Sequence, residues 1–346
     1  MDDAALTELL QHVRGTPPTE AQAAQLMQAS RDPAVALKVF AAASDVRDAV
    51  LGREFKLCSE VAQITPCLVR PFCKYCTFSP VDGLSTDEVL HGVRLAEATG
   101  IENIRLSGGT DVGNDGAGIL DLVREVRRHT ARPLQLNAGP NYGRETLRQL
   151  RDLGVTEVGS SLETINAEVF AKTKPGDSLQ ARMDTARAID EVGLGLQSVI
   201  MVGLGSSDED YVRHLYFLKT LEHLTHLPIS RFNPFKGTPM SKVPRASPWD
   251  AARLCAVARL VLRTPDIRIA AGGGPDDIPL WLMAGGNRIT SVFIHQKKTE
   301  PDRFTGDNLQ VISRRMVDDI EVVNRTAVCR RFAEGMGFTV TPAGAR

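Results

Sequence analysis

The stretch FKLCSEVAQITPCLVRPFCKYCTFSP, residues 55–80, joins an apolar segment to a loop that is rich in cysteine. Residues 55–64 have the short apolar pattern of a β-strand. The loop that follows places Cys67, Cys73 and Cys76 within ten positions, which is half of the six cysteines in the chain. Thiols that gather in this way in a reducing compartment indicate metal binding or redox chemistry rather than a disulfide.

Composition and charge limit the class of protein. The chain has 346 residues, of which 42% are hydrophobic and 24% charged, and this suits one large barrel or two domains. Its net charge of -1 gives no indication of a nucleic-acid partner or of binding to an anionic membrane surface. The opening residues MDDAALTELLQHVRG are acidic and amphipathic, unlike a secretory signal, and no apolar run reaches the length of a membrane span. We therefore predict a cytoplasmic protein with no nucleic-acid or membrane partner.

Short apolar segments alternate with amphipathic helices from residue 55 onward. The predicted strands are 55–64, 101–107, 133–138, 155–163, 196–203, 227–233, 267–273 and 288–294. The clearest helix between them begins at Ser85, which forms a capping-box pattern with Glu88. Eight strands with intervening helices predict an α/β fold, and specifically a (β/α)8 TIM-type barrel.

Three segments follow from this pattern. Residues 1–50 are predicted to be helical, residues 51–300 to form the barrel, and residues 301–346 to form a charged C-terminal extension with one helix. On this map the cysteine loop follows the first barrel strand. It therefore lies at the C-terminal mouth, where barrel enzymes place their catalytic groups.

The three clustered cysteines allow three interpretations. They could be buried apolar thiols, although three within ten positions make this a weak explanation. They could hold a structural zinc ion, but zinc takes a fourth ligand, and His91, the nearest histidine, falls in an amphipathic helix. They could also hold an iron–sulfur cluster through three thiolates, which leaves one iron open to a substrate.

The cysteine loop and the strand after it resemble the radical S-adenosylmethionine (SAM) superfamily. The last two cysteines flank Tyr75 in a Cys-x-aromatic-Cys pattern, whereas the five residues 68–72 make the first gap longer than the superfamily's commonest spacing. The segment LSGGT is similar to the superfamily's glycine pair, whose bare backbone approaches the amino group of SAM. This resemblance implies that the SAM contacts include Tyr75, Gly108, Gly109 and Thr110.

Residues 160–205 are similar over their full length to the biotin synthase-like branch of that superfamily. The branch includes the [FeFe]-hydrogenase maturase, methylornithine synthase and the maturase group of the [Fe]-hydrogenase guanylylpyridinol cofactor. The sequence of this segment most resembles that last group. The resemblance implies that Glu163 binds the ribose hydroxyls of SAM, with Ser161 beside it. It also implies that Arg182 pairs with the SAM carboxylate and that Asn137 lies among the contacts to cofactor or substrate.

The resemblance implies a radical enzyme with two cofactors. Cys67, Cys73 and Cys76 would hold a [4Fe–4S] cluster, and reductive cleavage of SAM would give a 5′-deoxyadenosyl radical. That radical would abstract hydrogen from a small organic substrate in cofactor biosynthesis, with a pyridinol-type hydrogenase cofactor precursor as one candidate. A one-electron donor such as a flavodoxin or ferredoxin is implied as a partner, and an oxygen-sensitive enzyme is expected.

A second cluster would change the reaction. Biotin synthase holds one inside its barrel through cysteines on three strands and a late arginine, but the matching strands here lack cysteine, and Gly273 stands about where the arginine would be. Cys58 and Cys329 could still meet and hold another type of second cluster, which would allow a sulfur insertion of the lipoyl or biotin synthase kind. Cys255 is expected to lie in the core.

Two alternatives come from other classes. One is a zinc-stabilised barrel that serves as a binding protein, and the other is a barrel enzyme whose reaction needs no metal. For an enzyme, the candidate substrate contacts near the mouth are Asn137, Arg231, Asn233 and Lys236. The two basic side chains would suit a carboxylated or phosphorylated substrate. Arg231 could equally face outward in a salt bridge, since strand alternation does not decide its face.

Overall fold

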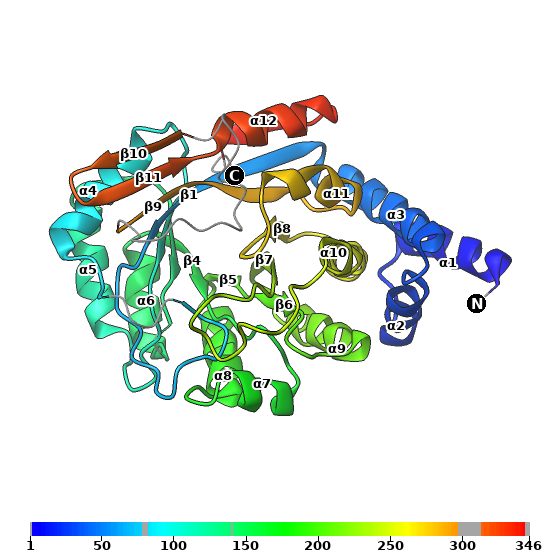
Figure 1. Cartoon of the computed structure of the whole chain (residues 1–346), viewed down its shortest axis with the longest axis horizontal. Coiled ribbons are helices and arrows are strands. Elements are labelled where there is room, and N and C mark those ends of the chain that lie inside the picture. The colour runs from blue at the N-terminus through cyan, green and yellow to red at the C-terminus, as the bar shows by residue number, and fades with distance from the viewer. Residues whose placement is uncertain (1, 78–81, 140, 297–312, 343–346) are drawn as a thin grey trace.

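The computed structural model describes residues 2–77, 82–139, 141–296 and 313–342. Parallel strands close into a barrel with helices around it, which confirms the predicted (β/α)8 fold (Figure 1). The barrel strands are β1 (Glu54–Ala62), β2 (Ile104–Ser107), β3 (Leu134–Asn137), β4 (Val155–Gly159), β5 (Gly195–Gln197) with β6 (Ile200–Val202), β7 (Leu224–Arg231), β8 (Asp266–Ile269) and β9 (Arg288–Gln296). Closure comes from the parallel pairing of β9 with β1.

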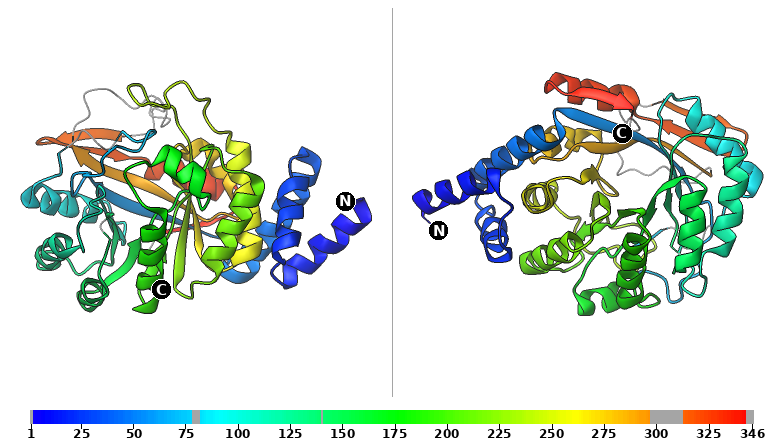
Figure 2. Two further views of the ribbon diagram at one scale, coloured as in Figure 1. Left: turned by 90° about the horizontal axis from the view of Figure 1, so that it is seen from below. Right: turned by 180° about the vertical axis from the view of Figure 1, so that it is seen from behind.

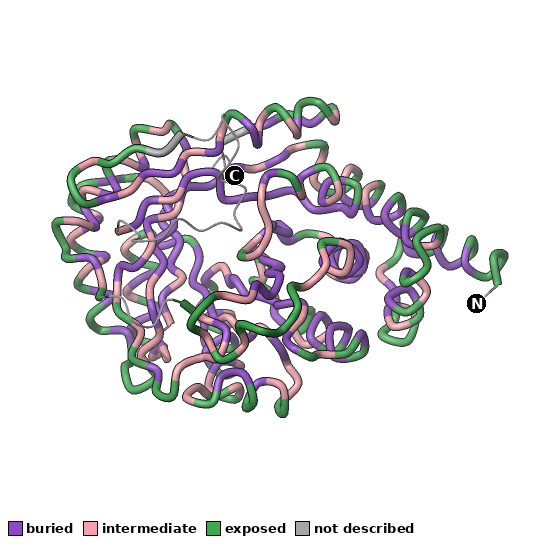
Figure 3. Tube along the Cα trace, in the orientation of Figure 1, coloured by how far each residue is buried: buried purple, intermediate pink, exposed green. Residues whose placement is uncertain are grey.

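Helices cover the outer faces of the barrel strands. They are α4 (Thr86–Glu97), α5 (Ala117–Arg127), α6 (Arg144–Asp152), α7 (Ala167–Thr173), α8 (Leu179–Glu191), α9 (Asp208–Lys219), α10 (Pro248–Leu262) and α11 (Ile278–Met283). The predicted capping box at the start of α4 is confirmed, because the Ser85 amide donates to Glu88 Oε2 at 2.7 Å and the Glu88 amide donates to Ser85 Oγ at 3.3 Å. Buried backbone follows the strands and the inner faces of the helices (Figure 3).

The fifth strand position is divided. Residues 196–203 were predicted as one strand, but Ser198 and Val199 separate β5 from β6, and the register against β7 shifts after Leu196. The Ser198 hydroxyl donates to the carbonyl of Ser160 at 2.9 Å, and the Glu163 amide donates to the carbonyl of Val199 at 2.8 Å. The break therefore lets the segment after β4 bind to the fifth strand, and that segment carries Glu163.

The barrel separates between β8 and β9 toward the mouth. These strands pair only at Arg268–Arg288 and Ile269–Ile289. Beyond that point β9 pairs instead with β11 (Ile320–Asn324), which forms an antiparallel hairpin with β10 (Ser313–Val317). The hairpin therefore pairs with the part of the β9 edge to which β8 is no longer hydrogen-bonded.

The C-terminal extension contributes more than the one helix that was predicted. The helix α12 (Thr326–Gly335) is present, but β10, β11 and β12 (Thr339–Pro342) join the barrel sheet as well. β12 pairs in parallel with residues 54–57 of β1, which is the half of β1 that β2 does not reach. The sequence prediction missed β12, whose partner β1 lies at the other end of the chain, and it also missed the hairpin of β10 and β11, although those two strands are adjacent in the sequence.

The predicted N-terminal helices lie against the side of the barrel (Figure 2). They are α1 (Asp3–Gly15), α2 (Glu20–Ala29) and α3 (Pro33–Leu51), and α3 packs along α10 and α11 while α2 packs on α9 and α10. The fully buried Arg47 of α3 donates to the carbonyls of Leu282 at 2.5 Å and Gly286 at 3.3 Å. This buried arginine attaches the helical segment to the turn before β9.

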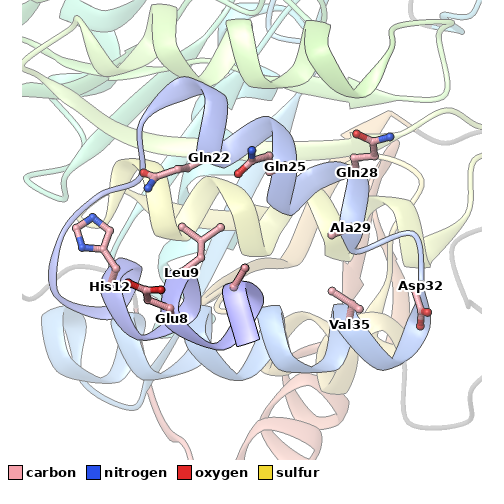
Figure 4. A pocket seen from close by; sticks show the side chains of 10 residues that line it. Glu8, Leu9, His12, Gln22, Gln25, Gln28, Ala29, Asp32 and Val35 are labelled. Carbon is pink, nitrogen blue, oxygen red and sulfur yellow. The ribbon is translucent and has the colours of Figure 1, made fainter. Parts of the chain in front are cut away.

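An open groove of about 960 Å³ runs between the three N-terminal helices, far from the mouth of the barrel (Figure 4). Glutamines of α2 line one side, and Glu8 and His12 of α1 lie opposite them. In the part of the chain that the structure describes, no helix is both long and apolar enough to cross a membrane.

The buried His214 of α9 predicts a pH dependence of stability. Burial lowers its pKa to about 3, and neither ring nitrogen has a hydrogen-bond partner among the described residues. In the unfolded chain a histidine titrates near pH 6.5, so the unfolded state binds more protons than the folded state between about pH 6.5 and 3. The free energy of unfolding should therefore fall as the pH drops, by up to about 1.4 kcal/mol per pH unit from this residue.

Urea unfolding at a series of pH values measures this slope. His214→Leu should reduce it by one proton, whereas His12→Leu, at an exposed position of α1, should leave it unchanged. Equal slopes for the wild type and His214→Leu would contradict the prediction.

Candidate active site

The predicted site residues follow the C-terminal ends of consecutive strands. The cysteine loop follows β1, residues 108–110 follow β2, Asn137 ends β3, and Ser161 and Glu163 follow β4. Arg182 comes from the first turn of α8 and is buried. The mouth of the barrel therefore collects side chains that lie more than 100 residues apart in the sequence, as in other barrel enzymes.

The glycine pair after β2 makes room for the cysteine loop. A Cβ atom on Gly109 would lie 2.4 Å from Cys67 Cα, and one on Gly108 would lie 2.2 Å from Thr65 Oγ1. The Gly109 amide donates to the carbonyl of Thr65 at 3.0 Å, and the Leu68 amide donates to the carbonyl of Thr110 at 2.7 Å. Both glycines therefore allow two loops to pack backbone against backbone, a role that the sequence did not predict.

Tyr75 anchors the other half of the cysteine loop. Its ring is buried in a small cluster with Met201, Leu204 and Phe232, and the partly buried Cys73 and Cys76 pack against the same cluster. Two backbone hydrogen bonds add to this anchor, because the Lys74 amide donates to the Thr173 carbonyl at 2.8 Å and the Met240 amide donates to the Lys74 carbonyl at 3.1 Å. The aromatic residue between the two cysteines therefore holds the loop over the ends of β6 and β7.

The three thiols of the loop differ from the other three cysteines in exposure. Cys67, Cys73 and Cys76 are partly exposed, whereas Cys58, Cys255 and Cys329 are fully buried, and none of the six forms a disulfide among the described residues. No three His, Cys, Asp or Glu side chains stand close enough together to hold a metal ion in the described residues, and this holds for the loop cysteines too. Burial raises the pKa of Cys73 to about 12, with Lys174 acting in the opposite direction, so iron must displace a proton there.

The donor set of the loop fits an iron–sulfur cluster with three protein ligands. Cys67, Cys73 and Cys76 are soft thiol ligands on one loop, and solvent reaches each of them. The expected fourth cysteine or histidine of a structural zinc site is missing from the loop, and His91 lies on α4 beside Asp318, with 3.8 Å between Nε2 and Oδ2.

Four charged side chains form a buried network beside the loop. Lys174 Nζ lies 2.5 Å from Glu163 Oε2 and 3.3 Å from Asp177 Oδ2. Arg182 Nε donates to both oxygens of Asp177 at 3.2 and 3.1 Å, and its Nη2 donates to Thr110 Oγ1 at 3.0 Å. Two carboxylates thus face two cations, and the network links the segments after β2 and β4 to α8.

The charges of this network support one another. Burial would raise the pKa of Asp177, but Arg182 and Lys174 outweigh it, so the pKa is lowered. Burial would lower the pKa of Lys174, but Glu163 and Asp177 outweigh burial and the repulsion of Arg182, so the pKa is raised. Both groups are therefore charged at neutral pH. Because Asp177 already binds Arg182, any ligand carboxylate at Arg182 would share that guanidinium with Asp177.

Sequence reasoning missed Lys174, Asp177 and Ser160. The first two belong to the segment KPGD, which lies between the predicted residues Glu163 and Arg182. The available signal was their charge, because a lysine and an aspartate three residues apart can each form an ion pair with an oppositely charged neighbour, here Glu163 and Arg182. Ser160, rather than its neighbour Ser161, makes the structural hydrogen bond, donating to the Arg182 carbonyl at 2.7 Å.

The candidate substrate contacts divide into different environments. Asn137 Oδ1 accepts from Gln197 Nε2 at 3.0 Å, and Arg231 pairs with Asp277, with 2.7 Å between Nη2 and Oδ2. Asn233 is buried, and its Oδ1 has no partner among the residues described, whereas Lys236 is exposed. Arg231 therefore faces a carboxylate of its own chain.

Gly273 lies beyond the end of β8, at about the position where biotin synthase has the arginine of its second cluster site. The strand β8 nevertheless carries Arg268, which donates from Nη1 to Thr290 Oγ1 on β9 at 2.6 Å. An interior arginine is thus present without the cysteines that would accompany it in biotin synthase.

Comparisons with known proteins identify the family of this chain. Residues 67–218 match the family model of the radical SAM superfamily, and residues 228–325 match the biotin and thiamin synthesis associated domain. An uncharacterized protein of Methanocaldococcus jannaschii is 30% identical over 268 residues, which cover 74% of this chain and 70% of that protein. The chain belongs to the radical SAM superfamily.

Other radical SAM proteins support the branch and the fold. Biotin synthase of Carboxydothermus hydrogenoformans is 26% identical over 306 residues, which cover 84% of this chain and 91% of that enzyme. The crystal structure of methylornithine synthase superposes with a TM-score of 0.78 at 21% identity, over 96% of this chain and 97% of that one. The [FeFe]-hydrogenase maturase HydG of C. hydrogenoformans superposes with a TM-score of 0.80 at 16% identity, over 99% and 80%.

This chain is therefore an enzyme of the biotin synthase-like branch of the radical SAM superfamily, as predicted. Members of the superfamily use a [4Fe–4S] cluster and SAM, need a reductant and act on small molecules. The three-cysteine loop and the charged network both lie at the mouth of the barrel.

The charged network predicts a cost for removing Asp177. Asp177→Asn leaves Lys174 and Arg182 buried with one carboxylate between them, so the free energy of unfolding should fall by about 3 kcal/mol. Asp184→Asn on α8 is the control, because Asp184 pairs with Arg187 at the surface, and it should change stability by less than about 0.5 kcal/mol. Urea unfolding of both variants measures the difference, and equal losses would disprove the role of the network.

Proposed function

We propose that this radical SAM enzyme binds a [4Fe–4S] cluster through Cys67, Cys73 and Cys76 and removes hydrogen from a small organic substrate in cofactor biosynthesis. The single observation that carries the proposal is the position of these three partly exposed cysteines on one loop over the barrel mouth, while the other cysteines are fully buried. Bound there, the cluster and SAM would supply one-electron chemistry that yields a 5′-deoxyadenosyl radical.

The chain's own residues would bind SAM and keep water away. The carboxylate of Glu163 can accept hydrogen bonds from a ribose diol while Lys174 neutralises it. The guanidinium of Arg182, held by Thr110 and Asp177, can bind a carboxylate. Gly108, Gly109, Ser161 and Asn137 line the same mouth as proposed cofactor contacts. The apolar cluster around Tyr75 would limit the access of water to the site.

The proposal also includes a substrate and an electron-donor partner. The sequence of residues 160–205 most resembles the maturase group of the [Fe]-hydrogenase guanylylpyridinol cofactor. This resemblance supports a pyridinol-type precursor as substrate. A flavodoxin or a ferredoxin would suit the single-electron reduction that this chemistry needs. A cytoplasmic location remains a prediction from the sequence.

The triad predicts the iron content and the activity. Anaerobic reconstitution should give about four irons per chain, and with dithionite and SAM the protein should form 5′-deoxyadenosine, detected by mass spectrometry. Replacing Cys67, Cys73 and Cys76 together by serine should abolish both iron binding and product. Cys255→Ala, in the fully buried core of α10, is the control and should retain both. Zinc alone, without 5′-deoxyadenosine, would instead favour a zinc-stabilised binding barrel.

Sulfur insertion would require a second cluster, and the structure offers poor ligands for it. Cys58 is fully buried, its thiol donates to the carbonyl of Ile289 at 3.3 Å, and Cys329 is a fully buried residue of α12. We therefore expect the double variant Cys58→Ala with Cys329→Ala to retain the iron content of the wild type. About eight irons per chain in the wild type, halved in this variant, would support the sulfur-inserting alternative.

A further inference from the structure

Three buried arginines meet inside the barrel below the mouth. Arg105 of β2, Arg268 of β8 and Arg288 of β9 are 2%, 6% and 3% exposed. Arg288 Nη2 donates to Gln135 Oε1 of β3 at 2.9 Å, although β1 and β2 stand between those two strands in the sheet. This hydrogen bond must therefore cross the interior of the barrel.

The other two arginines approach one carboxylate from opposite sides. Arg105 Nε lies 3.7 Å from Glu60 Oε2 on β1, and Arg268 Nη1 lies 3.9 Å from the same atom, past the intervening strand β9. Both separations are longer than a hydrogen bond. Glu60 therefore offsets part of the charge of both guanidinium groups. It accepts a hydrogen bond from neither of the two nitrogens that approach it.

The remaining interior acids already have partners. Asp266 pairs with Lys56 Nζ at 2.7 Å and with Arg288 Nη1 at 3.3 Å. Glu157 is hydrogen-bonded to His226 Nδ1 at 3.0 Å. Burial, together with the nearby arginines, places the pKa of His226 well below its ordinary value, so this ring is neutral.

An excess of positive charge follows from these pairings. Three arginines and Lys56 are opposed by the carboxylates of Glu60, Asp266 and Glu157, so the cations outnumber these carboxylates by one, and the buried thiol of Cys58 lies near Arg268 and Arg288 as well. Burial, and next the repulsion of Arg105, lower the pKa of Arg268 to about 9, so the excess persists at neutral pH.

The same three arginines also carry unused hydrogen-bond donors. Arg105 Nη1, Arg268 Nε and Arg288 Nε are all buried and have no partner within the described ranges. Buried N–H groups of charged side chains are normally paired, because leaving them unpaired costs the full desolvation of the group. Unpaired donors on three strands, with an excess positive charge, indicate that the interior is built to receive an anion.

We propose that Arg105, Arg268 and Arg288 bind a carboxylate group of the substrate inside the barrel, which assigns the substrate to the small organic acids. The proposal rests on the proposed function, since it concerns the substrate of the same site. A carboxylate carries one negative charge, matches the single excess cation and suits the planar fork of a guanidinium. A phosphate dianion would overcompensate that excess, and Glu60 would repel it.

The position of the arginines also limits the shape of the substrate. Arg105 lies three residues before Gly108 on the path of β2, a rise of about 10 Å along a strand. Arg105 Nε donates to Ser107 Oγ at 3.3 Å, which draws the guanidinium toward the mouth. A substrate anchored here by its carboxylate would extend its other end toward the loop of Cys67, Cys73 and Cys76.

Equilibrium binding to the full-length, cluster-loaded protein tests the proposal without turnover. Calorimetry is performed with SAM present and reductant absent, using acetate, succinate and benzoate as probes, with succinamide and inorganic phosphate as comparisons. At least one carboxylate should bind, and the neutral diamide should bind at least about tenfold more weakly than succinate. Failure of all three carboxylates to bind, or stronger binding of phosphate, would overturn the assignment.

Variants locate the binding site. Arg105→Met and Arg268→Met should each weaken carboxylate binding at least about tenfold, and since each removes an excess buried charge, both should stay folded by near-ultraviolet circular dichroism. Arg105→Lys keeps the charge without the fork, so it should give an intermediate affinity. Arg14→Met is the control, because Arg14 of α1 forms an exposed ion pair with Asp45 of α3, and it should leave the affinity unchanged. Unchanged affinity in both methionine variants would refute the site.

SAM cleavage by the wild type separates this proposal from the proposed function. Binding of carboxylates without 5′-deoxyadenosine on reduction would contradict the proposed function and leave the arginine site standing. Formation of 5′-deoxyadenosine without carboxylate binding would contradict the arginine site alone.

Discussion

The parallel pairing of β1 with both β2 and β9 is the constraint on which the rest of the molecule depends. It closes the barrel, and because β1 is longer than β2 it also pairs with β12 near its start. At its other end β1 leads into the cysteine loop, which packs on the glycines that follow β2. The same pairing therefore fixes both the barrel and the position of the three thiols.

The interior of this barrel is unusually polar for a packed core. TIM-type barrels are commonly filled with branched apolar side chains, whereas here arginines, carboxylates and a neutral histidine occupy the interior. Such groups are tolerated only where they are paired, and most of them are. At the mouth, Glu163, Lys174, Asp177 and Arg182 balance one another, but deeper inside the positive charge is in excess. This gradient suits a site that holds a cofactor above and an anionic group below.

The sequence predicted those parts of the structure that depend on local pattern. The capping box at Ser85, the buried cysteine of α10 and the alternation of strands with helices all depend on residues near one another. Prediction failed where partners are distant. Residues 155–163 were expected to be strand throughout, but β4 ends at Gly159, and Glu163 takes a positive φ of 60° to pair with the fifth strand. The strand β12 was missed for the same reason, because its partner β1 lies at the other end of the chain.

The sequence alone determined the superfamily, the barrel and the position of three clustered thiols, because spacing along the chain is enough to define a cysteine loop after a strand. Only the tertiary structure showed that Gly108 and Gly109 accommodate the cysteine loop, and that Lys174 and Asp177 bind the predicted Glu163 and Arg182. It alone brought Arg105, Arg268 and Arg288 together. Alternation along a strand leaves the face of each side chain open. The closure of the barrel decides which face points inward and which side chains from distant strands meet there.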